Sequence, residues 1–142
     1  MSLSALMLGA KADYQASTNP AANTEASITL PSGSGTFIIL CAHLTVVQGA
    51  TQTPLPNLQV ALADGTVIGL YPGASAAMSA STTSTFDWAP GRPLTAGAGA
   101  TFNTSPIPEG LAVKGGWVVS TVTTGKGANT DLSALTLHVL VL

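Results

Sequence analysis

The feature that most constrains the fold is the way apolar residues occur in short runs, separated by turn residues and never at helical spacing. No window places apolar residues at i, i+3, i+4 and i+7 opposite a charged face, as an amphipathic helix requires. Val, Ile, Leu and Thr instead fill runs bounded by Gly, Pro, Asn and Asp. The sequence therefore predicts an all-β fold, a single antiparallel β-sandwich or barrel domain over residues 1–142.

The clearest local signal is the segment LQVALADGTVIGLY, from Leu58 to Tyr71. Apolar residues alternate before and after the pair Asp64-Gly65, as they do in two strands joined by a tight turn. An Asp-Gly pair in this position is typical of a type I′ turn, in which both central residues take positive φ. We therefore expect a β-hairpin here.

Further stretches are expected to be strands, among them the short runs Ser27 to Leu30 and Trp117 to Thr124. Apolar residues occupy both odd and even positions in two of these stretches, Thr36 to Gln48 and Leu132 to Leu142. This pattern is typical of strands buried on both sides. We expect each to have the core on one side and a covering loop or partner on the other. Ala76 to Phe86, rich in Ala, Ser and Thr, is also expected to form a strand or strands.

The N-terminal residues 1–24 are expected to form a strand or an extended arm. No positive charge precedes the short apolar run Leu3 to Leu8, so we expect no signal peptide. The longest apolar stretch, Phe37 to Val47, is too short to span a membrane as a helix.

Charge is unusually scarce, since the chain has 4 Lys+Arg and 6 Asp+Glu, or 7% charged residues. Typical globular domains have about 25%. The four basic residues are widely spread in the sequence, which argues against nucleic-acid binding and against a polybasic membrane contact. Much of the surface should therefore be neutral and hydroxyl-rich, or covered by a partner.

No pattern of catalytic, cofactor-binding or metal-binding residues emerges. His43 and His138 lie within apolar strands, and the acidic residues are scattered without a ligand spacing. The segment TTGKGA lacks the glycine and the Ser/Thr of a P-loop. Cys41, the single cysteine, is expected to be a small buried side chain. We therefore expect no enzyme activity, no cofactor and no metal.

One segment, Phe86 to Pro93, concentrates aromatic and charged residues: Phe86, Asp87, Trp88 and Arg92. Trp and Arg are enriched in interface hot spots, so Phe86, Trp88, Arg92 and the separate Trp117 are the candidate partner contacts. Two other interpretations stay open at this point. The aromatic residues could pack into the domain's own core, or they could stack on a sugar.

The segment PIPEGLAVKGGWVV, from Pro106 to Val119, leads through two turns into a strand, with Lys114 as a solvated turn residue. In this segment, and in its small size, β content and low charge, the chain resembles accessory virion proteins of tailed bacteriophages, the jelly-roll head decoration or cement proteins. The resemblance implies a homotrimer, made in the host cytoplasm, that binds the major capsid protein or another virion protein. The alternative is a fibre or adhesin module that binds a glycan or receptor through Trp88 or Trp117.

Overall fold

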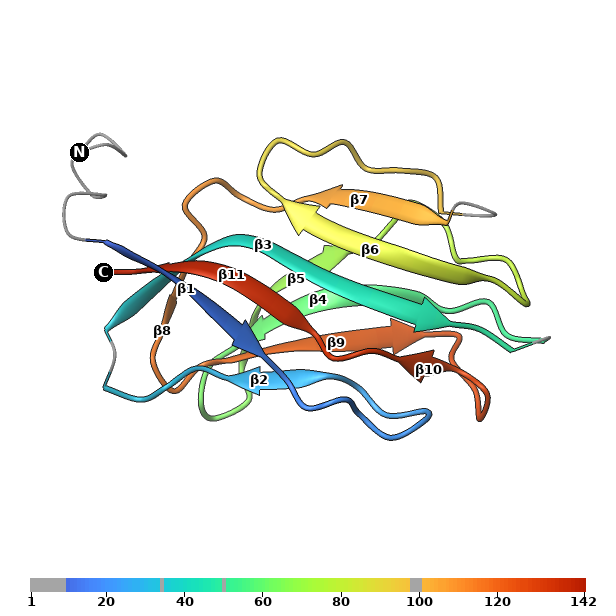
Figure 1. Cartoon of the computed structure of the whole chain (residues 1–142), viewed down its shortest axis with the longest axis horizontal. Coiled ribbons are helices and arrows are strands. Elements are labelled where there is room, and N and C mark those ends of the chain that lie inside the picture. The colour runs from blue at the N-terminus through green and yellow to red at the C-terminus, as the bar shows by residue number, and fades with distance from the viewer. Residues whose placement is uncertain (1–9, 34, 50, 98–100) are drawn as a thin grey trace.

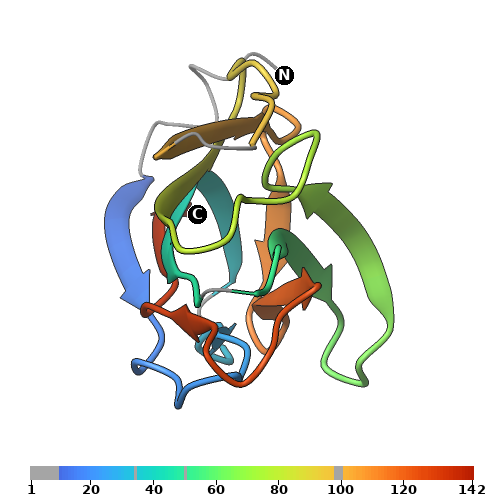
Figure 2. The ribbon, with the colours of Figure 1, turned by 90° about the vertical axis from the view of Figure 1, so that its right-hand side faces the viewer.

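The computed structural model describes residues 10–33, 35–49, 51–97 and 101–142. In these residues the regular structure is entirely β, and the strands form two sheets that pack face to face (Figure 1, Figure 2). The all-β sandwich predicted from the sequence is confirmed.

Sheet A has seven strands and is built around the long strand β3. Strands β10 and β11 pair with one side of β3, and β6 and β8 pair with the other. Strand β1 lies beyond β11 at one edge, and β7 lies beyond β6 at the other. The bounds are β1 Lys11–Ala16, β3 Thr36–Val47, β6 Thr83–Ala89, β7 Phe102–Pro106, β8 Ala112–Lys114, β10 Asp131–Leu132 and β11 Thr136–Val141.

Sheet B has four strands in the order β2-β9-β4-β5, all antiparallel to their neighbours. Strands β2 and β5 are its edges. Figure 2 shows the β4–β5 hairpin as the outermost part of this sheet. The bounds are β2 Ser27–Thr29, β4 Leu55–Ala61, β5 Val67–Pro72 and β9 Val118–Thr124.

The order of the strands is that of a jelly roll. With β7, β8 and β10 set aside, the sheets read β1-β11-β3-β6 and β2-β9-β4-β5. Apart from the β4–β5 hairpin within sheet B, successive strands of this set lie in opposite sheets and close as two nested Greek keys, which is jelly-roll connectivity. One pair departs from the expected antiparallel pattern, because β7 runs parallel to β6 at the edge of sheet A.

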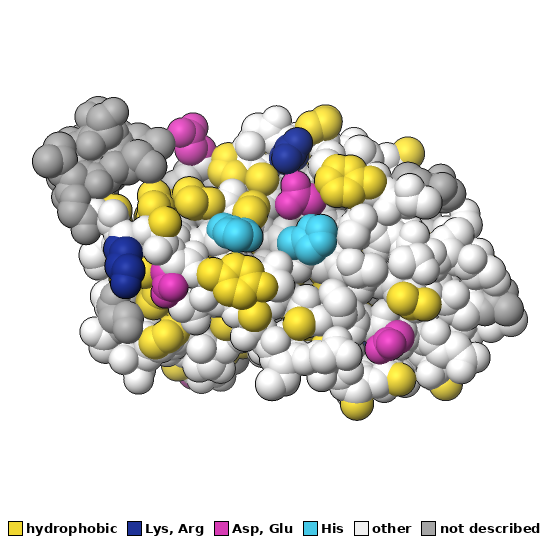
Figure 3. All heavy atoms as spheres, in the orientation of Figure 1, with side chains coloured by type: hydrophobic (Ala, Val, Ile, Leu, Met, Phe, Trp, Pro, Cys, Tyr) yellow, Lys and Arg dark blue, Asp and Glu magenta, His cyan; other side chains and the backbone are white. Residues whose placement is uncertain are grey.

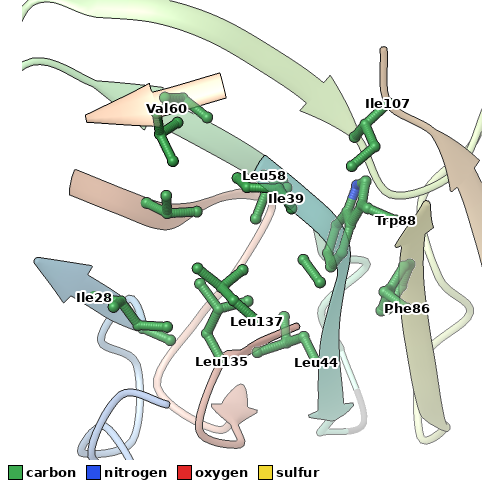
Figure 4. Packing of buried hydrophobic residues seen from close by; sticks show 14 of the residues in the cluster. Ile28, Ile39, Leu44, Leu58, Val60, Phe86, Trp88, Ile107, Leu135 and Leu137 are labelled. Atoms are coloured by element: carbon green, nitrogen blue, oxygen red, sulfur yellow. The ribbon is translucent and has the colours of Figure 1, made fainter. Parts of the chain in front are cut away.

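The hydrophobic core fills the space between the two sheets (Figure 4). Alternate residues of each inner strand point into it, and the intervening residues face outward. Truncating one of these buried side chains to Ala typically costs about 2–5 kcal/mol. The largest fully buried side chains are Trp88, Phe37, Phe86, Leu30, Ile39, Leu44, Leu58, Met78, Leu132, Leu135, Leu137 and Val46.

The predicted hairpin is present as β4 and β5, but its turn is not type I′. The Gly65 N–H bonds to the Leu62 carbonyl, and Gly65 has a φ of 89° while Asp64 does not have positive φ. This is a type I turn followed by a left-handed glycine, the three-residue hairpin loop. The Asp64 side chain accepts the Thr66 N–H at 2.9 Å, which holds it in this conformation.

The expectation that β3 is buried on both sides is wrong within this chain. Val139 lies opposite Ile39 while His138 lies opposite Cys41, so Leu40 forms a bulge. The bulge reverses the alternation, and residues before it and after it therefore point into the same core. Apolar residues occupy both odd and even positions of β3 because the inward-facing positions shift by one residue at the bulge. Leu40 and Val47 are exposed on the outer face.

Of two other expected segments, the N-terminal one does contain a strand and the other begins later than expected. The described part of the expected arm contains strand β1, which pairs with β11 along its whole length, while the apolar run Leu3 to Leu8 lies outside the described residues. Strand β6 begins at Thr83, not at Ala76. The preceding loop instead buries Ala74 and Met78 in the core, which explains its apolar content.

Candidate interaction surfaces

Two of the four predicted contact residues, Phe86 and Trp88, belong to the core. Both are fully buried on the inner face of β6, and their rings stack at a centroid distance of 6.0 Å. The Trp88 indole N–H donates to the carbonyls of Tyr71 and Pro72, at 3.1 Å each. Phe86 and Trp88 therefore present no side-chain surface to a partner.

The other two predicted residues, Arg92 and Trp117, keep some surface. Arg92 lies in the loop after β6, and its guanidinium is 3.4 Å from the Asp87 carboxylate. Trp117 is half-buried against the core beside the turn that follows Lys114. Lys114 itself is exposed at the end of β8, as expected for a turn residue. The fold thus separates the four residues into a buried pair, an exposed arginine and a half-buried tryptophan.

The outer face of sheet A gathers polar and aromatic side chains, and we call this group the histidine face: Tyr14, Cys41, His43, Asp87 and His138. Register places Tyr14 beside His138, His138 beside Cys41, and His43 beside Asp87. The Tyr14 and His138 rings meet edge to face at 5.3 Å. Figure 3 shows the two histidines next to each other near the middle of this face.

Two exposed aromatic rings lie on the strands at the edges of this face. Tyr14 on β1 is 54% exposed and Phe102 on β7 is 52% exposed. Sequence reasoning singled out neither ring; for Tyr14 the reason is that the pairing of β1 with β11 joins residues more than a hundred positions apart. Within β1 itself, the only local sign of the outward-facing Tyr14 ring is the alternation of side chains along the strand.

The chemistry of the histidine face does not favour a nucleophile or a metal ion. Burial raises the pKa of the Cys41 thiol, and the nearby Asp87 carboxylate raises it further. The thiol is therefore protonated near neutral pH, when it is a poor nucleophile and a poor ligand. Among the described residues, no group of three or more His, Cys, Asp or Glu side chains is arranged to hold a metal ion.

Sheet B differs sharply from sheet A in charge. Its strands read SIT, VVSTVTT, LPNLQVA and VIGLYP, without a single Asp, Glu, Lys, Arg or His. All the charged residues that lie in strands belong to sheet A. The outer face of sheet B is therefore a neutral surface of hydroxyl, amide and aliphatic side chains.

The edge strand β5 adds apolar surface to this neutral face. Val67, Ile68 and Leu70 are 51%, 50% and 55% exposed, although all three are large aliphatic residues. The sequence predicted the strand but not its place at an edge, because the hairpin pattern does not reveal which neighbours each strand has.

An ionic cluster closes one end of the sandwich. Glu25, just before β2, accepts hydrogen bonds from Lys126, the Thr121 hydroxyl and both the N–H and hydroxyl of Thr123. Burial would raise the pKa of Glu25, but these donors together hold it below its ordinary value. The cluster ties the segment before β2 to β9 and has the geometry of a structural clamp.

In the part of the chain that the structure describes, no helix is long and apolar enough to cross a membrane.

No protein-family model matches the chain, and no curated protein matches it. Solved structures that are similar come from infectious bursal disease virus. One, of the Gx strain, shares 16% identity at a TM-score of 0.40 and aligns with 93% of this chain and 30% of its own. Another, the VP2 subviral particle, shares 13% identity at a TM-score of 0.41 and aligns with 93% of this chain and 32% of its own. The chain spans about a third of these proteins, so the jelly-roll assignment rests on its own strand order.

Proposed function

We propose that this chain is a structural virion protein, a jelly-roll module that decorates and stabilises a phage head as a homo-oligomer. Its partners are the major capsid protein or another virion protein, and a trimer is the symmetry that the resemblance to decoration proteins implies. The protein works by assembly and not by catalysis.

The observation that carries the proposal is the neutral outer face of sheet B together with the exposed aliphatic residues of β5. Burying such a surface removes apolar area from water without desolvating a charge, and a charge buried without a partner is costly. An uncharged surface of this kind suits a permanent contact with other subunits. Jelly rolls serve in capsids and also in lectins, so the fold is compatible with the proposal and does not establish it.

Arg92 and Trp117 are the predicted partner contacts that remain part of the proposal. Arg92 is half exposed and bonded to Asp87 by a single long contact, so it can reorient toward a carboxylate of a partner. Trp117 offers the uncovered part of a large apolar ring. Phe86 and Trp88 are no longer candidates because they are buried.

The test uses heads of the virus whose genome encodes the chain, with accessory proteins stripped off. Labelled chain is sedimented with the heads, and the heat stability of the heads is followed. We expect saturable binding and more stable heads, with Arg92→Ala binding about tenfold more weakly and Arg92→Lys in between. Absence of binding, or binding without saturation, would overturn the proposal.

A second candidate function is favoured by the two exposed rings on sheet A. Tyr14 and Phe102 lie on the outer strands of a face that also carries His43, His138 and Asp87. Aromatic rings that stack on sugars, beside groups that bond to hydroxyls, are suited to glycan binding. A glycan array probed with the native chain and with Tyr14→Ala tests this. A sugar signal lost in the variant would favour the glycan-binding function over the structural one.

A further inference from the structure

The four edges of the two sheets differ in how they are protected against pairing with another strand. An unprotected edge offers free backbone groups to any neighbouring chain, and charges, short length or a covering loop prevent this. Strand β1 carries Lys11 and Asp13, and β2 has only three residues. The β7 edge is covered, because Thr95 bonds to both the N–H and the carbonyl of Thr104.

Strand β5 has the weakest protection of the four. It has six residues, none charged, and within the described residues no strand pairs with its open side, where the Trp88 indole bonds to the Pro72 carbonyl at the end of the strand. A bulge near Val67 and Ile68 and the proline at its end, Pro72, limit the free stretch without closing it. The stretch that remains is Ile68 to Tyr71.

The pairing of β5 with β4 determines which backbone groups are free. The Gly73 N–H bonds to the Pro56 carbonyl in the same register as the ladder. Alternate residues of an antiparallel strand direct both backbone groups to the same neighbour. Tyr71 and Gly69 therefore pair with β4, and Leu70 directs its N–H and its carbonyl toward the open side.

We propose that β5 pairs antiparallel with β5 of a second copy of this chain, about a two-fold axis at Gly69. The pairing joins the two copies of sheet B into one continuous sheet. Ile68 then lies opposite Leu70 of the second copy on each side of the axis. The half-exposed aliphatic side chains become cross-strand pairs, which stabilise antiparallel sheets.

The charge distribution selects a second copy as the occupant. In a two-fold contact a charge close to the axis meets its own copy, which is repulsive, but β5 and the outer face of sheet B carry no charge. The nearest charge along the chain, Asp64, lies five residues from the axis, so the two copies of Asp64 sit about 30 Å apart at opposite ends. That distance exceeds the screening length of about 8 Å in physiological salt.

Gly69 suits the position on the axis. The Tyr71 ring covers its Cα, and a Cβ at Gly69 would lie 2.8 Å from the Tyr71 hydroxyl oxygen. Without a side chain at Gly69, the two backbones approach closely at the non-hydrogen-bonded pair, where Cα atoms are about 4.5 Å apart. Such a contact is isologous and joins copies two by two. If the chain forms trimers, this two-fold contact can join one trimer to another but cannot hold the three copies of one trimer together.

The inference goes beyond the proposed function, and its test needs no capsid. Sedimentation velocity of the full chain is measured from micromolar to millimolar concentration, beside amide hydrogen exchange of β5. We expect an even number of copies, and exchange of the Leu70 N–H that slows as concentration rises. Leu70→Lys should weaken association at least about tenfold, because it places a cation in the aliphatic pair.

The matched control is Leu94→Lys, which changes an exposed leucine in a loop and should leave association unchanged. A chain that stays monomeric or purely trimeric to millimolar concentration would overturn the β5 pairing. So would concentration-independent exchange at Leu70 in the native chain, a result that needs no variant to fold. Either result leaves binding to heads, measured separately, as the test of the proposed function.

Discussion

Trp88 donates its indole N–H to the backbone carbonyl of Tyr71 at 3.1 Å, so the largest core side chain of sheet A holds the end of the β5 edge strand of sheet B. The Pro72 carbonyl shares the same donor. The bond crosses between the two layers of the sandwich. It fixes the position of the strand that we propose for self-pairing.

Replacing Trp88 with Phe should therefore destabilise the protein and loosen β5. The Pro72 carbonyl loses its donor and the Tyr71 carbonyl keeps only its bond within the sheet, which costs about 1–3 kcal/mol, and the smaller ring leaves a cavity that adds to this. Chemical denaturation measures the first effect, and faster amide exchange in β5 measures the second. Trp117→Phe, at a half-buried site, is the control and should cost under about 1 kcal/mol. Equal costs at both sites would show that the Trp88 bond contributes nothing.

Glu25 should make stability depend on pH. Its pKa is lowered in the folded chain, so the folded state holds the proton less tightly than the unfolded state does. The contribution of Glu25 is present above its unfolded pKa, near 4.3, and is lost as pH falls through the lower folded value. Melting temperature should decline across this acidic range.

The Glu25→Gln variant isolates that contribution. It should cost about 1–2 kcal/mol at neutral pH, because Lys126 and two threonines lose a charged acceptor. The cost should vanish at acidic pH, where Glu25 is itself protonated. Glu109→Gln, in an exposed turn, serves as the control and should change little. A Glu25→Gln cost that is the same at both pH values would contradict the clamp.

Gly65 should be required by the β4–β5 turn for its backbone conformation and not for space. Its φ is 89°, and a Cβ added at this glycine would meet no atom within 4 Å. Gly65→Val should cost about 1–2 kcal/mol, the usual penalty of left-handed backbone for a side chain. Gly65→Asn should cost less, since Asn tolerates this region. Chemical denaturation of the two variants measures both losses of stability. Equal losses for Gly65→Val and Gly65→Asn would show that backbone conformation is not the reason glycine is needed.

Much of the strand pattern was predictable from the sequence because alternation is a local property. The runs at β2, β3, the β4–β5 hairpin and β9 follow from residues that are neighbours along the chain. The bulge at Leu40 was not predictable, since it exists only in the pairing of β3 with β11. The parallel pairing of β7 with β6 likewise depends on the path of a long loop.

The surfaces were less predictable than the strands. In β6 a signal was present: Phe86 and Trp88 alternate with Asp87, so the two rings share one face while the charge takes the other. Reading that alternation would have placed both rings in the core. The neutrality of sheet B was also present in the sequence of its strands, but only the topology shows that those four strands lie together.

The copy number of the chain in purified virions tests the central claim most directly. Quantitative mass spectrometry of intact particles measures its ratio to the major capsid protein, in virions banded on a density gradient. We expect a fixed ratio, at many copies per particle, that persists through repeated purification. A chain that is absent from the particles, or that is present only in trace and variable amounts, would contradict a structural role in the virion.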